Sequence, residues 1–194
     1  MRINKAEFIT SIGDIAQYKP SGIPEICFAG RSNAGKSSLI NYITNNAGLA
    51  RVGSQPGKTR LINLFLINDA FRLVDLPGYG YARASKAEIK AWGALIEQYL
   101  ARTESLREVF HLVDVRHAPT ADDIMLVDYM VHNDIPFCHI ATKCDRVPKT
   151  KLKEHISLIA AGLRVPETSI IAVSAEKNIG GDKLLDRIES VLTR

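Results

Sequence analysis

The segment with the strongest constraint on this chain is residues 30–37. It fits the pattern G-x-x-x-x-G-K-[ST], with Gly30, Gly35, Lys36 and Ser37 at the fixed positions. Two glycines allow a tight backbone turn in which successive N–H groups point at one anion. An apolar run precedes the segment as a strand would, and a helical pattern follows it. These features predict a phosphate-binding loop, in which Lys36 reaches the phosphates and the Ser37 hydroxyl binds Mg²⁺. The alternative is a glycine-rich turn without function.

Composition indicates an ordinary water-soluble domain. The chain has 194 residues, of which 46% are hydrophobic and 24% are charged. We expect residues 1–194 to form one nucleotide-binding domain, with residues 1–22 as a short N-terminal extension packed on it. No apolar run approaches the length of a bilayer span, and the N-terminus lacks the apolar centre of a signal peptide. We therefore expect a cytoplasmic monomer with no membrane partner. A net charge of +4 permits contact with RNA without establishing it.

Apolar, β-rich runs alternate with helical patterns along the chain. The predicted strands are residues 25–29, 61–67, 71–75, 109–115, 137–142 and 169–173, and the predicted helices are residues 36–45, 86–102, 121–132, 149–161 and 181–192. This alternation predicts an α/β fold of three layers, the P-loop NTPase architecture, with a mostly parallel sheet of about six strands and helices on both faces. The short link at residues 68–70 predicts a hairpin and hence one antiparallel edge strand. Phe8 and Ile9 could add another short strand.

Two stretches, residues 48–60 and 76–85, have no predicted element. Each follows an element that carries nucleotide chemistry, and ligands bind at the carboxyl ends of strands in such sheets. Thr59 lies in the first stretch, where its hydroxyl could complete a Mg²⁺ shell when a triphosphate is bound and release it after hydrolysis. The alternatives are plain connecting loops and a solvated threonine.

The sequence Asp75-Leu76-Pro77-Gly78 ends an apolar strand. A carboxylate at a strand end can hold Mg²⁺ through water, opposite Ser37. Gly78 leaves its N–H free to approach a γ-phosphate. The pattern D-x-x-G is weak alone, but its position about 40 residues after a phosphate loop strengthens it.

The sequence Thr142-Lys143-Cys144-Asp145 closes another apolar strand and matches the guanine-selecting pattern [NT]-K-x-D. A fixed carboxylate at Asp145 can accept hydrogen bonds from guanine N1–H and the 2-amino group, whereas adenine offers no such pair of donors. Thr142 stands where asparagine is more common, and its hydroxyl can still bond to the backbone of the phosphate loop. Ser174-Ala175-Glu176 follows the last strand and resembles a loop that contacts guanine O6.

The motifs occur in the order and at the spacing of a GTPase, which favours GTP over an ATP-using kinase or ATPase. The predicted GTP-binding residues are Gly30, Arg31, Ser32, Asn33, Ala34, Gly35, Lys36, Ser37, Ser38, Gly57, Lys58, Thr59, Arg60, Leu61, Asp75, Leu76, Pro77, Gly78, Thr142, Lys143, Cys144, Asp145, Val173, Ser174, Ala175 and Glu176. Ser37, Thr59 and Asp75, the last through water, are the predicted Mg²⁺ residues.

The chain resembles the EngB/YihA family of bacterial ribosome-biogenesis GTPases, within the TrmE-Era-EngA-EngB-septin-like superfamily. The resemblance rests on residues 30–38, 56–60, 75–82 and 142–145, and on residues 92–93, 97–100 and 113–119 outside the common nucleotide motifs. It implies a GTP- and GDP-binding switch that helps to assemble the large ribosomal subunit and is needed for normal growth and cell division. The implied partners are precursors of that subunit, both rRNA and ribosomal proteins.

Lys36 and Thr59 are expected to contribute to catalysis. Two further residues, Tyr79 and Asn33, indicate how fast hydrolysis is and where its catalytic charge comes from. Tyr79 follows Gly78 where Ras-like enzymes place a water-orienting glutamine, and a phenol cannot replace that amide. This predicts slow intrinsic hydrolysis, and it keeps open a nucleotide-dependent scaffold that does not hydrolyse GTP. Asn33 is the residue that cation-dependent relatives use to help bind K⁺, which would supply positive charge near the β- and γ-phosphates. The alternative is that asparagine merely suits the backbone of the loop.

Basic residues elsewhere have weaker implications. Arg116 and His117 follow a strand at the edge of the predicted site, and we expect them to be structural or to face a partner. Lys149, Lys151 and Lys153 begin a predicted helix. They could contact RNA, although a solvated helix face is the simpler interpretation.

Overall fold

The computed structural model describes residues 1–51, 61–80 and 86–194, with the backbone alone for residues 86–92. The strands in these residues are β1 (Ala6–Ile12), β2 (Glu25–Gly30), β3 (Ile62–Ile67), β4 (Phe71–Asp75), β5 (Leu106–Asp114), β6 (Phe137–Thr142) and β7 (Ile170–Ala172). The α-helices are α1 (Lys36–Ile43), α2 (Lys86–Arg102), α3 (Ala121–His132), α4 (Leu152–Leu163) and α5 (Gly181–Leu192). Short 3₁₀ helices occupy Ile15–Gln17, Cys144–Arg146 and Glu167–Ser169.

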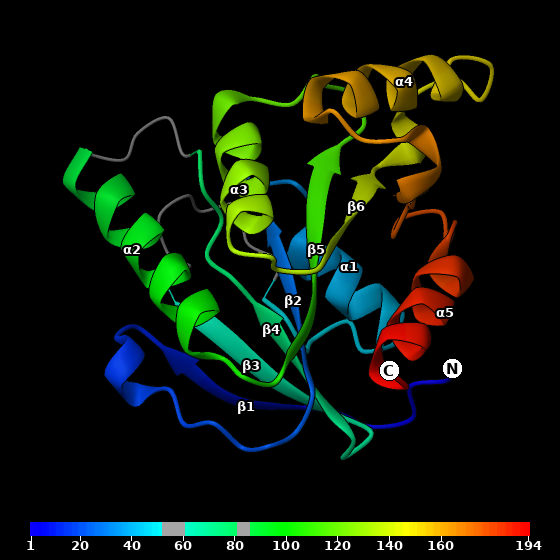
Figure 1. The fold of residues 1–194 in the computed structure, drawn as a ribbon. Helices are drawn as coiled ribbons and strands as arrows, with labels where there is room; N and C mark the ends of the chain where they lie inside the picture. The colour runs from blue at the N-terminus through cyan, green and yellow to red at the C-terminus, as the bar shows by residue number, and fades with distance from the viewer. Residues whose placement is uncertain (52–60, 81–85) are drawn as a thin grey trace.

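One sheet, in the order β1-β3-β4-β2-β5-β6-β7, forms the middle layer (Figure 1). The pairs from β4 through β2, β5 and β6 to β7 are parallel, and antiparallel pairing is confined to β1–β3 and β3–β4 at one edge. The predicted α/β architecture is confirmed. The sheet has seven strands rather than about six because β1 pairs outside β3. The register of β1 shifts between Phe8 and Thr10, which marks a bulge.

The central strands are apolar on both faces because helices cover both faces. All six residues of β2 are buried. One apolar cluster joins the sheet to α2, α3 and α4, and a second joins it to α1 and α5. Cys27 and Ala29 point into the first cluster, and Ile26 and Phe28 into the second. This two-sided burial explains why the central strands could be predicted from apolar runs.

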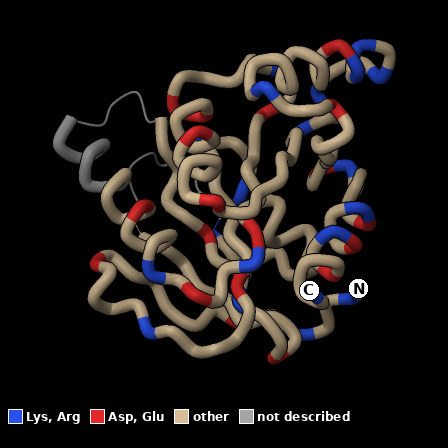
Figure 2. Tube along the Cα trace, viewed as in Figure 1, with Lys and Arg blue, Asp and Glu red and all other residues tan. Residues whose placement is uncertain are grey.

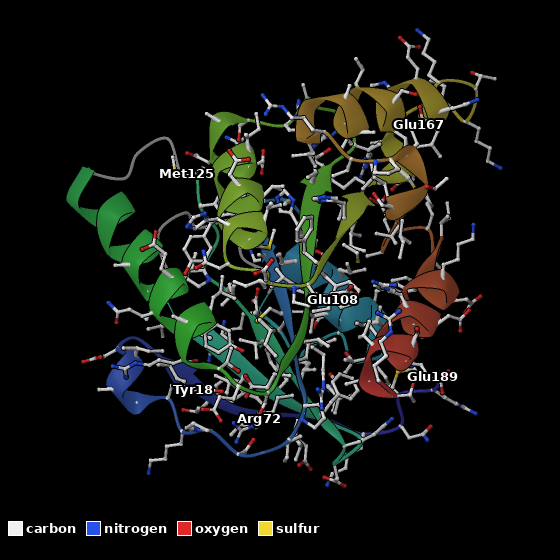
Figure 3. All side chains as sticks on the ribbon, viewed as in Figure 1. Tyr18, Arg72, Glu108, Met125, Glu167 and Glu189 are labelled. Carbon is white, nitrogen blue, oxygen red and sulfur yellow. The ribbon has the colours of Figure 1, made fainter. Side chains whose placement is uncertain are left out.

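The predicted bounds hold for β4, β6, α2, α3 and α5. The fourth helix starts at Leu152 rather than at residue 149, because residues 148–151 form a turn in which the Lys151 N–H donates to the Pro148 carbonyl at 2.8 Å. β5 begins at Leu106, three residues before its predicted start, where it pairs with the first residue of β2. The two ends of the chain lie close together (Figure 1), and the amino group of Met1 lies 2.8 Å from Glu189 of α5, whose side chain is labelled in Figure 3.

Candidate functional site

The phosphate loop, residues 30–37, connects the end of β2 to the first turn of α1. Its backbone turns through Asn33 and Gly35, which have left-handed φ angles of 66° and 98°. The Lys36 side chain folds back along the loop, and its Nζ donates to the Gly30 carbonyl at 3.3 Å. Burial lowers the pKa of Lys36, and the nearby Asp75 carboxylate opposes that shift. The Asp75 carboxylate offsets only part of the cost of burying the Lys36 ammonium charge. Such a group is suited to bind an anionic ligand.

Asp75 lies at the end of β4 beside this loop and is 3% exposed. Its Oδ1 atom is buried and has no hydrogen-bond partner among the described residues. Burial raises the pKa of Asp75, and the Lys36 ammonium lowers it. A buried carboxylate oxygen with a free lone pair fits a Mg²⁺ ion that approaches through its water shell. Ser37, in the first turn of α1, would supply the direct oxygen ligand, and the ion would neutralise phosphate charge.

The segment after Asp75, residues 76–80, lies along the phosphate loop. The Leu76 N–H donates to the Phe28 carbonyl at 3.0 Å, and the Ser32 N–H donates to the Tyr79 carbonyl at 2.8 Å. The structure thus brings the two predicted phosphate motifs, D-x-x-G and the phosphate loop, into direct contact.

The third motif meets the phosphate loop from the other side. The Thr142 hydroxyl donates to the Ala34 carbonyl at 2.6 Å, which is the bond expected of a threonine at this position. Lys143 Nζ donates to the Asn33 carbonyl at 2.7 Å and lies 2.9 Å from Asp114 Oδ2. The predicted guanine-selecting motif is therefore tied to the phosphate loop by two side chains.

Asp145 meets the fourth motif. Its carboxylate accepts a hydrogen bond from the Ser174 hydroxyl, and the Ser174 oxygen in turn accepts from the Lys177 N–H at 3.0 Å. The Cys144 N–H donates to the Val173 carbonyl at 3.1 Å. These bonds hold the loops after β6 and β7 together, with the Asp145 side chain only 9% exposed.

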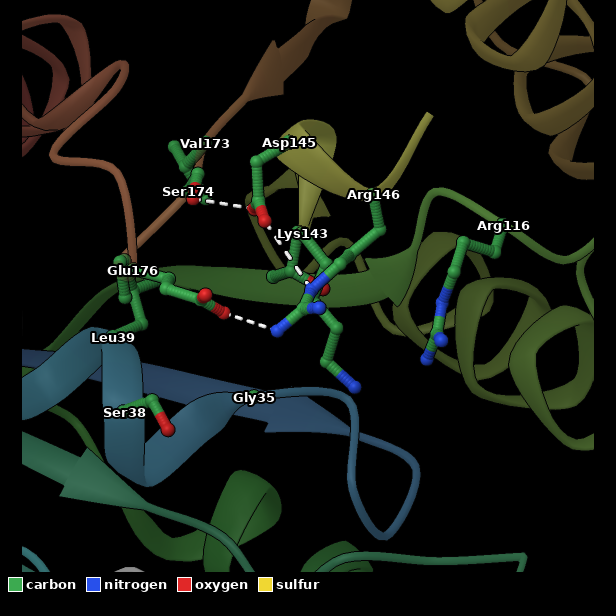
Figure 4. A pocket seen from close by; sticks show the side chains of 12 residues that line it. Gly35, Ser38, Leu39, Arg116, Lys143, Asp145, Arg146, Val173, Ser174 and Glu176 are labelled. Carbon is green, nitrogen blue, oxygen red and sulfur yellow. Dashed lines mark hydrogen bonds and ion pairs between the residues drawn. The ribbon is translucent and has the colours of Figure 1, made fainter. Parts of the chain in front are cut away.

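A cavity of about 420 Å³ lies between these loops and the start of α1 (Figure 4). Figure 4 shows Ser38 on one side and Asp145 and Ser174 on the other. Its lining residues are Gly35, Ser38, Leu39, Arg116, Thr142, Lys143, Asp145, Arg146, Val173, Ser174, Ala175 and Glu176. This base cavity is large enough for a purine and leads directly to the phosphate loop.

Three residues of the site were not predicted as nucleotide contacts. Arg146 pairs with both Asp145 and Glu176 at the base cavity (Figure 4). Asp114 binds the Arg116 guanidinium at 2.9 and 2.7 Å as well as Lys143. These hydrogen bonds hold the pKa of Asp114 well below its usual range against the effect of burial. The sequence offers little signal for the pairs Asp114–Lys143 and Arg146–Glu176, because their members come from segments far apart in the chain.

Arg116 also lines a second cavity of about 330 Å³, beside Arg31, Ser32 and Asn33. The two hydrogen bonds from its guanidinium to Asp114 are consistent with the structural role expected for Arg116. Of the other predicted residues, Gly57, Lys58, Thr59 and Arg60 lie outside the described part of the chain. Leu61 is 38% exposed, immediately before β3.

Comparisons with known proteins agree with this geometry. Residues 25–143 match the model of a family described as "50S ribosome-binding GTPase". A probable GTP-binding protein EngB from Bacillus subtilis (strain 168) is 42% identical over 195 residues, covering all of both chains. The chain belongs to the EngB family of GTP-binding proteins. This membership confirms the resemblance seen in the sequence, and with it the choice of GTP.

Solved structures extend the EngB comparison. A crystal structure of a probable GTP-binding protein engB has a TM-score of 0.73 and 25% identity, covering 87% of this chain and 98% of that one. NFeoB from S. thermophilus, bound to GDP.AlF4⁻ and K⁺, has a TM-score of 0.60 and 26% identity, covering 85% of this chain and 60% of that one. None of the helices in residues 1–51, 61–80 and 86–194 has the length and hydropathy of a bilayer span.

Proposed function

We propose that this EngB-family protein is a cytoplasmic, monomeric Mg²⁺-dependent GTPase that acts as a switch in assembly of the large ribosomal subunit. The observation that carries the proposal is the placement of Asp145 in a purine-sized cavity that opens onto the phosphate loop. In this role the protein would bind subunit precursors when loaded with GTP and leave them after hydrolysis. Normal growth and cell division would depend on that cycle.

The roles of the site residues follow from the geometry. Asp145 would accept hydrogen bonds from guanine N1–H and the 2-amino group. Backbone N–H groups of residues 30–37 and the Lys36 ammonium would hold the phosphates. Ser37, Thr59 and Asp75 would hold Mg²⁺, and the γ-phosphate would order the segments around Thr59 and Gly78. Hydrolysis would then release both segments.

Slow hydrolysis is supported by the position of Tyr79. Its hydroxyl lies 2.8 Å from Asp123 Oδ1 and 2.7 Å from His111 Nε2. A phenol held by two buried partners is not available to orient an attacking water. We therefore expect the catalytic charge to come from another source.

Ribosomal partners are supported by the family description and by the surface charge. Figure 2 shows Lys and Arg at the start of α4, whereas basic and acidic residues are mixed along α5. Lys149, Lys151 and Lys153 are exposed. Phosphate contacts by such side chains would make binding weaken as salt is raised.

Co-sedimentation tests the partner proposal. Protein loaded with a non-hydrolysable GTP analogue should pellet with large-subunit precursors, and protein loaded with GDP should stay in solution. Raising the salt should release it, because counterions compete for phosphate. Small subunits provide the matched control. Equal pelleting with GDP and the analogue, or with both subunits, would contradict the proposal.

Potassium dependence is a separate prediction. Asn33 is exposed in the phosphate loop and lines the second cavity. If its side chain helps to bind K⁺, GTP hydrolysis should be at least about tenfold faster in KCl than in NaCl, because a cation at the γ-phosphate stabilises the transition state. Single-turnover hydrolysis in the two salts, with subunit precursors present, measures this ratio.

Asn33→Gly separates the two explanations for this asparagine. Glycine accepts the φ of 66° but has no side-chain oxygen. The variant should hydrolyse GTP at the same rate in both salts. Retained stimulation would assign Asn33 to loop geometry alone, and no hydrolysis by wild type in either salt would favour the nucleotide-dependent scaffold.

A further inference from the structure

Tyr79, which is partly buried, lies at the centre of a hydrogen-bond chain that joins the segment after β4 to α3, β5 and β6. Its hydroxyl is 2.8 Å from Asp123 Oδ1 on α3 and 2.7 Å from His111 Nε2 on β5. His111 Nδ1 is 3.0 Å from Nδ1 of His139 on β6. Asp123, His111 and His139 are 2%, 0% and 1% exposed, so the three partners in this chain are buried.

The directions of these bonds follow from the chemistry of the groups. The Asp123 carboxylate only accepts, and its hydrogen bonds lower its pKa to about 2 against the effect of burial. The Tyr79 O–H therefore donates to Asp123, and the phenol oxygen accepts from His111 Nε2–H. The Nδ1 atoms of His111 and His139 are within hydrogen-bond distance, so one of them carries a proton that the other accepts. His139 Nε2 is buried without a partner among the described residues, and burial lowers the pKa of His139 to about 3.

The backbone around Tyr79 is equally closely held. An isolated parallel bridge joins Tyr79 to Arg31 of the phosphate loop. A Cβ on Gly78 would lie 3.0 Å from the Ser32 nitrogen and 3.1 Å from Lys36 Nζ. A Cβ on Gly80, where φ is +69°, would lie 2.7 Å from Arg31 Nε. Residues 78–80 thus lie close against the loop, where a side chain at residue 78 would crowd Ser32 and Lys36 and one at residue 80 would need a strained backbone.

Asp123 also anchors the far end of the chain. Its Oδ2 atom accepts from the Thr120 N–H and the Thr120 hydroxyl, both at 2.7 Å, in a capping box at the start of α3. A displacement of Tyr79 would remove one hydrogen bond from the Asp123 carboxylate and one from the His111 imidazole, leaving these two buried groups with their own longer contact of 3.5 Å between Oδ1 and Nε2. Such a loss is costly, and it resists movement of Gly78 away from the phosphate loop.

We propose that Tyr79 is a positioning residue for recognition of the γ-phosphate. The anchor that His111 and Asp123 form around its hydroxyl holds the backbone of Gly78 beside Lys36, where the third phosphate of GTP would lie. This inference rests on the proposed function, since it requires that GTP is the ligand. It assigns the Tyr79 ring to the interior beneath α3 rather than to the reacting water.

Tyr79→Phe tests this assignment because it removes only the hydroxyl. GDP lacks the group that Gly78 would contact, so its affinity should stay within about twofold. The affinity for a GTP analogue, guanosine 5′-[β,γ-imido]triphosphate, should fall roughly tenfold, since two buried groups each lose one hydrogen bond. Both affinities are measured by calorimetric titration with Mg²⁺, at a temperature where thermal melting shows every variant to be folded.

Tyr99→Phe is the matched control. Tyr99 is also buried and donates to a carboxylate, that of Glu25, at 2.6 Å. It belongs to α2, and Glu25 is the first residue of β2, at the end of that strand away from the phosphate loop. Its loss should lower the melting temperature and leave the ratio of analogue to GDP affinity unchanged. His111→Phe provides a second variant. It should reduce the same ratio, and combining it with Tyr79→Phe should add less than the sum of the two effects.

The proposal is overturned if Tyr79→Phe weakens both nucleotides equally or weakens neither. It is also overturned if Tyr99→Phe changes the ratio as much as Tyr79→Phe does. Wild-type protein is titrated first with GTP, GDP and ATP. Equal affinity for ATP would reject the proposed function itself, and this outcome is distinct from every result of the Tyr79 comparison.

Discussion

Asp145→Asn is expected to reverse the base preference of the protein. Guanine would lose its carboxylate partner, and its N1–H would face an amide that also carries donors. The affinity for GDP should fall roughly a hundredfold or more, because charged hydrogen bonds of about 1.5–3 kcal/mol each are lost. In addition, hydrogen-bond donors of guanine would face the N–H donors of the asparagine amide. Xanthosine diphosphate, which carries an oxygen in place of the 2-amino group, should gain affinity.

The fold should survive this change. The asparagine oxygen can still accept from the Ser174 hydroxyl, so the loops after β6 and β7 remain joined. Competition titrations with guanosine, xanthosine and adenosine diphosphates measure the preference. Asp182→Asn, at an exposed position in the first turn of α5, is the control and should leave all three affinities unchanged. If Asp145→Asn keeps the guanine preference, the base does not occupy this cavity as proposed.

Glu25→Ala is expected to cause the largest loss of stability. Glu25 is 0% exposed at the start of β2. Its carboxylate accepts from the Tyr18, Tyr99 and Thr103 hydroxyls at 3.0, 2.6 and 3.0 Å, and it pairs with Arg72 at 3.3 Å. Figure 3 shows Tyr18 and Arg72 at this end of the sheet. Removing the carboxylate leaves a partly buried cation and three hydroxyls short of an acceptor.

The free energy of unfolding should therefore fall by about 3–5 kcal/mol. Urea denaturation followed by far-ultraviolet circular dichroism measures it, in the absence of nucleotide. Glu7→Ala is the control, since Glu7 is exposed on β1 and its loss should cost less than about 0.5 kcal/mol. A loss below about 1 kcal/mol for Glu25→Ala would show that water or rearranged side chains replace the carboxylate.

The parts that could be predicted from the sequence are those that depend on local patterns. Apolar runs identified β4 and β6 with their correct bounds, because strands buried on both faces carry a continuous apolar signal. β1 was harder to predict. Four of its seven residues are exposed, since it is an edge strand paired on one side only, and its sequence lacks a clear alternation.

The site divides in the same way. Motif spacing predicted that Asp75 would lie opposite Ser37 and that Thr142 would bond to the phosphate loop, because strand ends converge at one edge of a parallel sheet. The position of the Tyr79 ring and the partners of its hydroxyl could not be predicted from motif spacing. Its partners, His111 and Asp123, come from β5 and α3, and only the packing of α3 on the sheet brings them to the phenol.

The two edges of the sheet also affect behaviour at high concentration. β1 carries a bulge between Phe8 and Thr10 and the charged side chain of Glu7, and β7 is only three residues long. Bulges, charges and short edge strands all interrupt the flat row of free backbone groups onto which another chain could add a strand. The fold therefore resists edge-to-edge aggregation at both edges of its sheet. We expect the protein to remain unaggregated at high concentration even without bound nucleotide.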